Sequence, residues 1–310
     1  MEGNTDALLE LLTPPALWQR FADLCTERPD IRVLSYVLGS RRKALEWIHS
    51  VGVCTDAELL RHAPPLAPQE LRQIVAAPEP EKFLWTGLID LLSFLELYEQ
   101  YRRGPIHTPA AILDFGCGCG RLLRLLAGHA DVWRVTGTDV NPALVDWCRS
   151  NLRAVETDLN GLVPPLRLTD QSFDLVYALS VFTHLPEAAT TLWLDELSRI
   201  LRPGGILIVT TSGTSVLETI RNSTLHQTMF GINRTEVDAI LKDFAETGLV
   251  FKRYDPHVIQ LARAGQDYGN LFIHRQYVLD RWHDQRFEVC EHLPGGLRGW
   301  QDIVVLRRRL

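Results

Sequence analysis

The sequence predicts an α/β fold, in which a doubly wound parallel sheet follows an all-helical N-terminal region. From Ile112 onward, short β-rich runs alternate with amphipathic runs, which is the pattern of strand–helix–strand units. Before residue 108, apolar residues recur at helical spacing, and proline-rich stretches separate them. A glycine-rich turn also follows the first β-rich run. We therefore expect a helical region over residues 1–108 and an α/β domain over residues 109–310.

The N-terminal region carries helical periodicity in "ALWQRFADLCTE", "IRVLSYVLGSRRKALEWIHS" and "EKFLWTGLIDLLSFLELYEQYRR". Thr55 followed by Glu58 has the form of a capping box and predicts a further short helix there. Two functions are compatible with the sequence of this region. Helices with Trp85, Phe94 and Tyr98 can cover a ligand as a lid, or the region can serve dimerisation or packing.

Seven β-rich runs and three amphipathic runs make up the expected α/β domain. The β-rich runs cover residues 111–115, 133–139, 153–158, 173–181, 204–211, 286–293 and 301–308. The amphipathic runs cover residues 120–128, 142–150 and 190–201, and in the last of them Trp193, Leu197, Ile200 and Leu201 share one face. The alternation of the two kinds of run favours a parallel sheet with helices on both faces.

Composition and charge narrow the functional classes. The apolar content of 46% is enough for a large core, and the net charge of -6 comes from 32 basic and 38 acidic residues that are interspersed. That distribution argues against a surface for nucleic acid. Because no signal sequence and no long apolar run is visible, we expect a cytoplasmic protein without a membrane partner. Of six cysteines, only Cys117 and Cys119 are close together, which predicts reduced thiols and no metal site.

The stretch "ILDFGCGCGR" predicts a loop that brings its backbone close to a ligand. Glycines at 116, 118 and 120 tolerate positive φ and carry no Cβ. A dinucleotide fingerprint needs a third glycine where Arg121 stands, so the loop disfavours NAD. Asp139 ends the next strand, where a carboxylate can accept hydrogen bonds from ribose hydroxyls. The two features together predict a nucleoside site without a clear pyrophosphate site.

From Ile112 to Thr211 the chain resembles the class I S-adenosylmethionine-dependent methyltransferases. The matching motifs are "LDFGCGCGR", Asp139, "FDLVYALSVFTHLP" and "LSRILRPGGILIVTT", which agree with the family in order and spacing. The tail from residue 287 resembles the family's final antiparallel strand pair, so the resemblance implies a seven-stranded, mostly parallel sheet with an antiparallel last strand. The "PPL" loop before the fourth strand resembles a bacterial subgroup that acts on small molecules and saccharides.

The resemblance implies S-adenosylmethionine as cofactor and assigns its contacts. Gly116 and Gly118 would pass under the methionine part, and Asp139 would hold the ribose. Asp114 would reach the cofactor's amino group through water or only fix the loop. Arg121 would pair with the methionine carboxylate or be a solvated residue in the first helical turn.

Further contacts follow the third and fourth strands. Asn160 and Gly161 lie where the family holds adenine, although "NG" is also an ordinary turn sequence. Ser180 would lie beside the methionine part. His184 is the candidate general base for a hydroxyl acceptor, and its alternative role is to cap or pack its own loop.

The predicted activity is methyl transfer to a small-molecule acceptor by in-line displacement, for which alignment and exclusion of water supply much of the rate. Oxygen on a saccharide or secondary metabolite is the favoured acceptor, and nitrogen is the alternative. The segment at about 213–270 is expected to select the acceptor, with Tyr268, His274 and Trp300 as weaker candidates for its pocket. An NAD-dependent oxidoreductase and a cofactor-binding protein without turnover are the alternatives from other classes. The expected partner is the acceptor alone, and a homodimer stays open.

Overall fold

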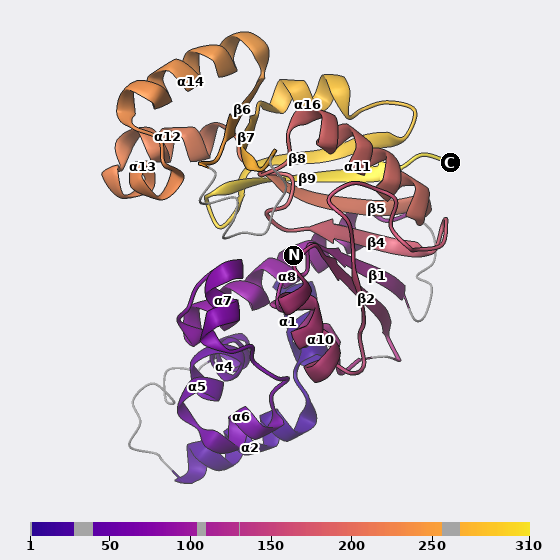
Figure 1. Cartoon of the computed structure of the whole chain (residues 1–310). Helices are drawn as coiled ribbons and strands as arrows, with labels where there is room; N and C mark the ends of the chain where they lie inside the picture. The colour runs from indigo at the N-terminus through magenta and orange to yellow at the C-terminus, as the bar shows by residue number, and fades with distance from the viewer. Residues whose placement is uncertain (1, 28–39, 104–109, 130, 256–266) are drawn as a thin grey trace.

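The computed structural model describes residues 2–27, 40–103, 110–129, 131–255 and 267–310. A seven-stranded sheet in the order β3-β2-β1-β4-β5-β9-β8 forms the centre of the α/β domain (Figure 1). Its strands are β1 (Ala110–Phe115), β2 (Trp133–Asp139), β3 (Glu156–Leu159), β4 (Phe173–Ala178), β5 (Leu201–Thr211), β8 (Phe287–Leu297) and β9 (Gln301–Arg308).

The direction of the strands confirms the predicted sheet. Strands β1 to β5 pair in parallel, whereas β9 pairs antiparallel with β5 on one side and with β8 on the other. In the register of β5 and β9, Thr211 lies opposite Asp302. The beginning of β9 therefore lies at the same edge as the ends of the parallel strands, which is the edge where open α/β sheets bind ligands.

Each face of the sheet has its own apolar layer, because successive strand residues point to opposite faces. Ile112, Tyr177 and Ile208 pack with helices α8 (Pro80–Tyr101), α9 (Leu123–Leu126) and α10 (Pro142–Asn151). Their neighbours Leu113 and Val209 pack with α11 (Glu187–Ile200) and α16 (Arg275–Arg281) on the other face. The predicted double winding is thus present.

The N-terminal helices are α1 (Glu2–Leu12), α2 (Pro15–Glu27), α4 (Arg41–Trp47), η1 (Ile48–Gly52), α5 (Val53–Thr55), α6 (Ala57–His62), α7 (Gln69–Val75) and α8. The described part of this region is helical, as predicted, and residues 31–39 of one predicted run lie outside the described residues. The predicted cap at Thr55 was wrong by one residue. Asp56 caps α6 by accepting from the Leu59 amide, while Thr55 donates to the Val51 carbonyl oxygen at 2.9 Å.

Helix α8 belongs to the core of the α/β domain. Phe94 is fully buried, and its ring lies 5.5 Å from that of Tyr177 on β4, measured between centroids. Tyr98 is also buried, whereas Trp85 is 45% exposed. Residues 104–109, which hold the predicted boundary between the two regions, lie outside the described residues.

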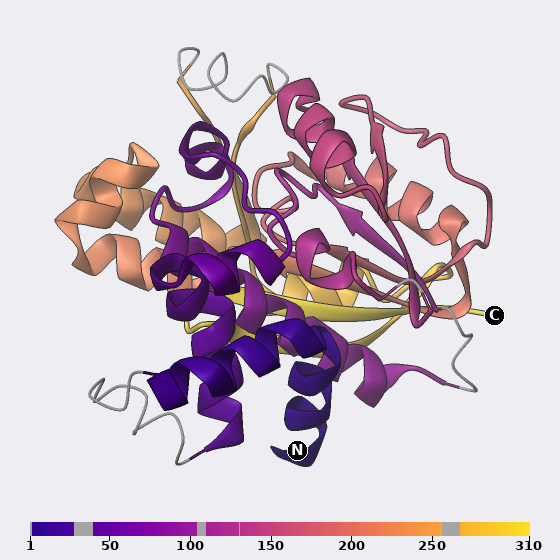
Figure 2. The same ribbon diagram turned by 90° about the horizontal axis from the view of Figure 1, so that it is seen from below.

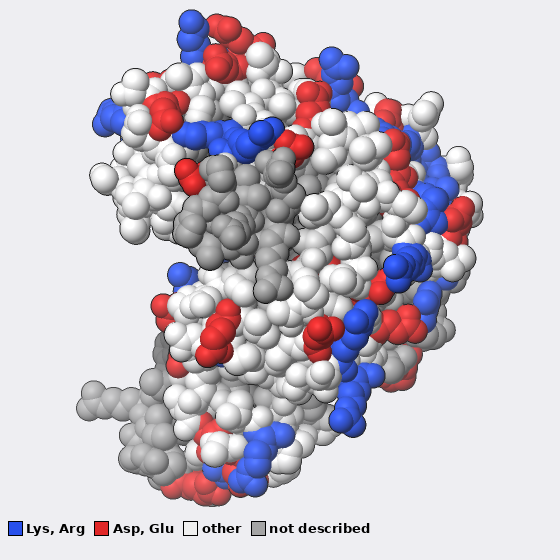
Figure 3. All heavy atoms as spheres, viewed as in Figure 1, with Lys and Arg blue, Asp and Glu red and all other residues white. Residues whose placement is uncertain are grey.

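A smaller layer of helices follows β5, within the segment expected to select the acceptor. It contains α12 (Thr214–Asn222), α13 (Thr224–Phe230) and α14 (Arg234–Thr247), followed by a two-stranded sheet of β6 (Leu249–Arg253) and β7 (Gly269–Ile273) (Figure 2). The sequence did not predict this sheet. Lys and Arg are mixed with Asp and Glu over the face drawn in Figure 3, in keeping with the interspersed charges of the sequence. None of the helices in the described ranges is long and apolar enough to cross a membrane.

Candidate cofactor and acceptor site

The carboxyl edge of the sheet brings most of the predicted site residues together. Gly116 follows β1, Asp139 ends β2, and Ser180 follows β4. The Ser180 hydroxyl donates to Oε1 of Gln301 at 3.0 Å, and its amide donates to Thr210. Ser180 itself has a φ of 58°, which is rare for a residue other than glycine and is found most often at functional sites.

The glycine loop is shaped by close packing as well as by its turn. Gly116 and Gly118 have φ values of 82° and 57°, which side chains rarely adopt. A Cβ on Gly116 would lie 2.3 Å from the Val181 side chain, and one on Gly118 would lie 2.7 Å from Val75 of α7. The missing side chains therefore make room for the loop after β4 and for the N-terminal region.

Asp139 and Asn160 offer the groups that a nucleoside requires. The two carboxylate oxygens of Asp139 accept from the Gly118 amide at 2.9 Å and the Asn141 amide at 2.8 Å, and each keeps a lone pair. Burial raises the pKa of Asp139. The Asn160 side-chain oxygen is buried without a partner among the described residues, while its amide nitrogen donates to the exposed Gly161. These acceptors fit ribose hydroxyls and an adenine amino group.

Asp114 lies deeper than a residue at the loop surface. It is 2% exposed and accepts a hydrogen bond from the Tyr177 hydroxyl at 3.2 Å. Burial raises the pKa of Asp114 to about 8, against a smaller lowering by Tyr177. The side chain is therefore largely protonated at neutral pH, and it can donate a hydrogen bond as well as accept one.

Arg121 faces the N-terminal region, so of its two predicted alternatives the solvated one was wrong, and the pairing with the methionine carboxylate stays a prediction. The side chain is 8% exposed, donates to the Thr86 hydroxyl at 3.0 Å, and lies 3.3 Å from the Asp90 carboxylate. Asp90 also accepts from Nε of Arg298 at 2.8 Å. Because Asp90 and Thr86 are on α8, the N-terminal region contributes charged and polar groups directly behind the glycine loop.

His184 lies in a cluster of aromatic rings. Its ring centroid is 4.8 Å from that of Tyr268 and 5.9 Å from that of Tyr254. Nδ1 lies 3.0 Å from the Gly269 carbonyl oxygen and 3.3 Å from the Tyr254 hydroxyl, which itself donates to Asn270 at 2.5 Å. A carbonyl oxygen can only accept, so Nδ1 carries the proton, and Nε2 of the neutral ring keeps a lone pair to which no residue in the described ranges donates.

Electrostatics connect this aromatic cluster with the nucleoside acid. Burial lowers the pKa of His184, so its imidazole is neutral at pH 7. The pKa of Tyr268 is raised by burial, then by Tyr254 and by the charge of Asp139. His184 follows β4 and Asp139 ends β2, so both lie at the carboxyl edge of the sheet, with β1 between the two strands.

Two weaker pocket candidates take part in packing elsewhere. His274 accepts from the Gln276 amide and caps α16. Trp300 packs on His226 and Phe230, with centroids 5.1 and 5.8 Å apart. No described contact links either residue to His184.

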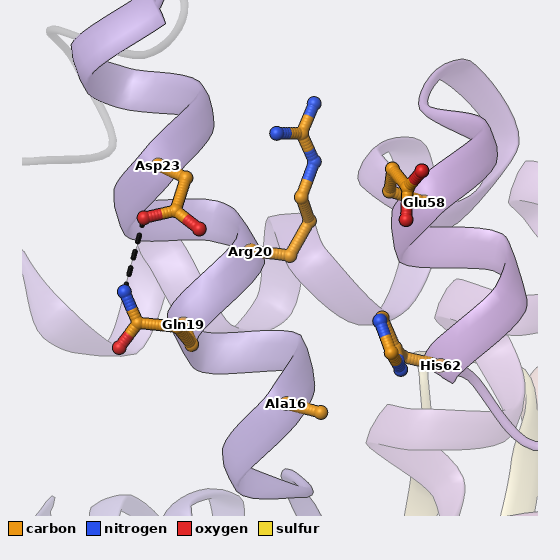
Figure 4. A pocket seen from close by; sticks show the side chains of 6 residues that line it. All are labelled: Ala16, Gln19, Arg20, Asp23, Glu58 and His62. Atoms are coloured by element: carbon orange, nitrogen blue, oxygen red, sulfur yellow. Dashed lines mark hydrogen bonds between the residues drawn. The ribbon is translucent and has the colours of Figure 1, made fainter.

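A cavity of about 360 Å³ lies away from the predicted site, between α2 and α6 (Figure 4). Its lining consists of Ala16, Gln19, Arg20, Asp23, Glu58 and His62. The Arg20 guanidinium is already paired with Asp56 and Glu27. The one arginine of the lining is therefore already neutralised by carboxylates of the chain.

Sequence reasoning missed Tyr254, Asn270, Asp90 and Arg298. Asp90 had a detectable pattern, because it is a carboxylate on an otherwise apolar face of a helix. The other three carry no local pattern, since their neighbours come from distant parts of the chain.

The middle of the chain matches a known protein family. Residues 113–209 match the family described as "Methyltransferase domain". A trans-aconitate 2-methyltransferase from Azoarcus sp. (strain BH72) is 36% identical over 110 residues, which are 34% of this chain and 41% of that protein. A 27-O-demethylrifamycin SV methyltransferase from Amycolatopsis mediterranei (strain S699) is 34% identical over 112 residues, 33% of this chain and 39% of that protein. The chain thus spans about two fifths of the curated relatives that it matches.

A solved S-adenosylmethionine-dependent methyltransferase from Methanosarcina mazei covers 69% of this chain and 97% of its own, with 20% identity and a TM-score of 0.45. A TM-score below 0.5 carries no argument by itself. The fold of the α/β domain is therefore assigned from the matched family and from the strand order. The α/β domain has the class I methyltransferase fold. Residues 113–209 thus carry a domain of the methyltransferase family.

Proposed function

We propose that this chain is an enzyme that transfers a methyl group from S-adenosylmethionine to an oxygen atom of a small-molecule acceptor. The names of two relatives, a trans-aconitate 2-methyltransferase and a 27-O-demethylrifamycin SV methyltransferase, support a small molecule as acceptor. The observation that carries the proposal is the neutral His184, whose Nε2 can take a proton at the same sheet edge as Asp139. The name of the second relative, which refers to a 27-O-demethyl compound, favours oxygen over nitrogen. A saccharide or secondary metabolite stays the proposed acceptor class, handled in the cytoplasm without nucleic acid or membrane.

The proposed cofactor contacts use the acceptors at the carboxyl edge. Asp139 would accept from the ribose hydroxyls, and Asn160 would accept from the adenine amino group through its unpartnered oxygen. Gly116, Gly118 and Ser180 would border the methionine part, with the protonated Asp114 beneath the loop. When bound, S-adenosylmethionine supplies a methyl group on a positively charged sulfonium.

The proposed role of His184 is to take the acceptor's proton at Nε2. The bond from Nδ1–H to the Gly269 carbonyl fixes the tautomer and the plane of the ring. Tyr254 supports the same nitrogen and is itself held by Asn270. The tilted ring of Tyr268, whose centroid is 4.8 Å away, would limit access of water to the imidazole, which favours in-line transfer.

Nitrogen acceptors are the second candidate, because a neutral amine also loses a proton after methylation. The observation that keeps this candidate is the same Nε2 lone pair of His184. Competition assays with labelled cofactor, in which hydroxyl and amine acceptors are offered together and the labelled atom is identified, separate the two.

We expect the chain to bind S-adenosylhomocysteine with a micromolar Kd, about -8 kcal/mol, and not to bind NAD. Asp139→Ala should remove about 1.5 to 3 kcal/mol of that affinity, because two ribose hydroxyls lose their acceptor. Isothermal titration calorimetry measures both. Asp139→Asn, which keeps one oxygen for a backbone amide, checks that the loop still folds, and Asp146→Ala on exposed α10 surface is the matched control. Unchanged affinity in Asp139→Ala would remove Asp139 from the site.

A further inference from the structure

A buried group of charges lies between α8, the glycine loop and the turn that joins β8 to β9. Asp90 is 1% exposed and stands between two guanidinium groups. Its Oδ1 accepts from Arg298 at 2.8 Å, and its Oδ2 lies 3.3 Å from Arg121 without a good hydrogen bond. One carboxylate thus serves two arginines.

The charges of this group do not balance. Arg121 and Arg298 contribute two positive charges and Asp90 one negative charge. Asp114, which also interacts with Arg121, is largely uncharged at pH 7 because burial raises its pKa to about 8. The single Asp90 carboxylate is shared by both guanidinium groups, so one positive charge of the group has no full partner and can pair with an anionic ligand.

Arg298 is the member that can meet such a ligand. Its side chain is 33% exposed, whereas those of Arg121 and Asp90 are 8% and 0% exposed. Asp90 accepts a hydrogen bond only from Nε of Arg298. No residue in the described ranges accepts one from the two terminal nitrogens of the Arg298 guanidinium. Those nitrogens form the planar donor pair that recognises a carboxylate with two hydrogen bonds.

The strand order places Arg298 on the acceptor side of the cofactor region. Its turn precedes β9, which is three strand spacings from β1 and four from β2. With about 4.8 Å between neighbouring strands, β9 lies about 19 Å from the strand of Asp139. The Arg298 side chain itself reaches back to Asp90, which also lies 3.3 Å from Arg121 beside the glycine loop. Gln301, three residues after Arg298, binds Ser180 and so keeps the turn at the carboxyl edge. A ligand group at Arg298 is thus separated from the nucleoside.

We propose that Arg298 recognises a carboxylate group on the acceptor and that Asp90, from the N-terminal region, holds its guanidinium in place. The proposal rests on the proposed function and narrows its substrate class to small molecules that carry a carboxylate. Arg298 has a φ of 55°, an uncommon conformation for a residue with a side chain, and the Asp90 contact fixes its direction. The N-terminal helices would then contribute to acceptor specificity through α8.

The test is calorimetric titration of the full chain, saturated with S-adenosylhomocysteine, with trans-aconitate, succinate and benzoate, each against its uncharged amide. We expect at least one carboxylate to bind with a Kd below about 1 mM and its amide at least tenfold more weakly. Arg298→Gln should weaken that carboxylate by at least about tenfold, with Arg298→Lys between the two, because lysine keeps the charge and loses the planar pair. Arg61→Gln, on the exposed side of α6, is the matched control.

The outcomes show whether the carboxylate that Arg298 binds belongs to the acceptor or to the cofactor. The affinity for S-adenosylhomocysteine should stay within about twofold in Arg298→Gln; a loss equal to that of the acceptor would assign the carboxylate to the cofactor and overturn the proposal. Equal binding by wild type and variant, or no binding of any of the three carboxylates, would also overturn it. The titration is repeated without S-adenosylhomocysteine. Binding of the carboxylate in this second titration tests Arg298 even if the proposed cofactor site fails. Thermal unfolding of each variant confirms that it is folded.

Discussion

Replacing His184 with glutamine is expected to lower turnover at saturating S-adenosylmethionine by about 100-fold or more, the usual contribution of a general base. Glutamine keeps a polar group of similar reach but has no basic nitrogen to take the acceptor's proton. The affinity for S-adenosylhomocysteine should stay unchanged, because His184 contacts Gly269 and Tyr254 rather than Asp139. Turnover with labelled cofactor and calorimetry on the same preparation measure the two quantities.

The pH dependence gives a second readout of the same residue. Burial lowers the pKa of His184 below its ordinary value, because it disfavours the charged imidazolium. The neutral form, which is the base, therefore already predominates at pH 7. In the wild type, kcat/KM should rise as the pH passes upward through this lowered pKa and then level off below neutrality. This acid limb should be absent from His184→Gln.

Two results would contradict the role as base. Joint loss of stability and cofactor affinity in His184→Gln would mean that the side chain only orders the loop after β4. Near-normal turnover would mean that the acceptor atom is already ionised, as a carboxylate oxygen is, or that the base lies elsewhere. His62→Gln, on α6 and away from the site, is the matched control for the change itself.

The parts of the fold that the sequence predicts are those that local patterns encode. Alternation of Ile112 and Leu113 between two apolar layers follows directly from the pleat of a strand. The glycines at 116 and 118 have the positive φ that their spacing indicated. Capping was less certain, because Thr55 and Asp56 are both good cap residues, and only the three-dimensional contact with Leu59 decides between them.

The site is less predictable, since its groups meet only after folding. Asp90 and Arg298 are 208 residues apart in sequence, and Tyr254 and His184 are 70 apart. No spacing rule joins such residues. Arg121 shows the same limit, because its position at the start of a helix suggests solvent, whereas α8 covers it. In the N-terminal region, the carboxylate of Asp90 on an apolar helix face is a local pattern, but nothing local shows that its partners are Arg121 and Arg298.

The last prediction concerns whether α8 can be separated from the α/β domain. Phe94→Ala should lower the free energy of unfolding by about 3 to 5 kcal/mol, the usual cost of removing a buried phenylalanine ring. Phe94 is fully buried against Tyr177 of β4, so the loss leaves a cavity between the helix and the sheet. Urea unfolding measures the change, and Trp85→Ala on the same helix, at a side chain that is 45% exposed, should cost much less.

The same packing predicts that residues 109–310 alone do not fold cooperatively. Without α8, Tyr177, Ile208 and Val305 lose their cover on one face of the sheet, and the Arg121 charge loses Asp90. A change of 3 to 5 kcal/mol is already a large part of the about 5 to 15 kcal/mol that stabilises a typical domain, and the deletion removes many such contacts. Cooperative unfolding of the fragment, or a cost below about 1 kcal/mol for Phe94→Ala, would instead make α8 a detachable cover.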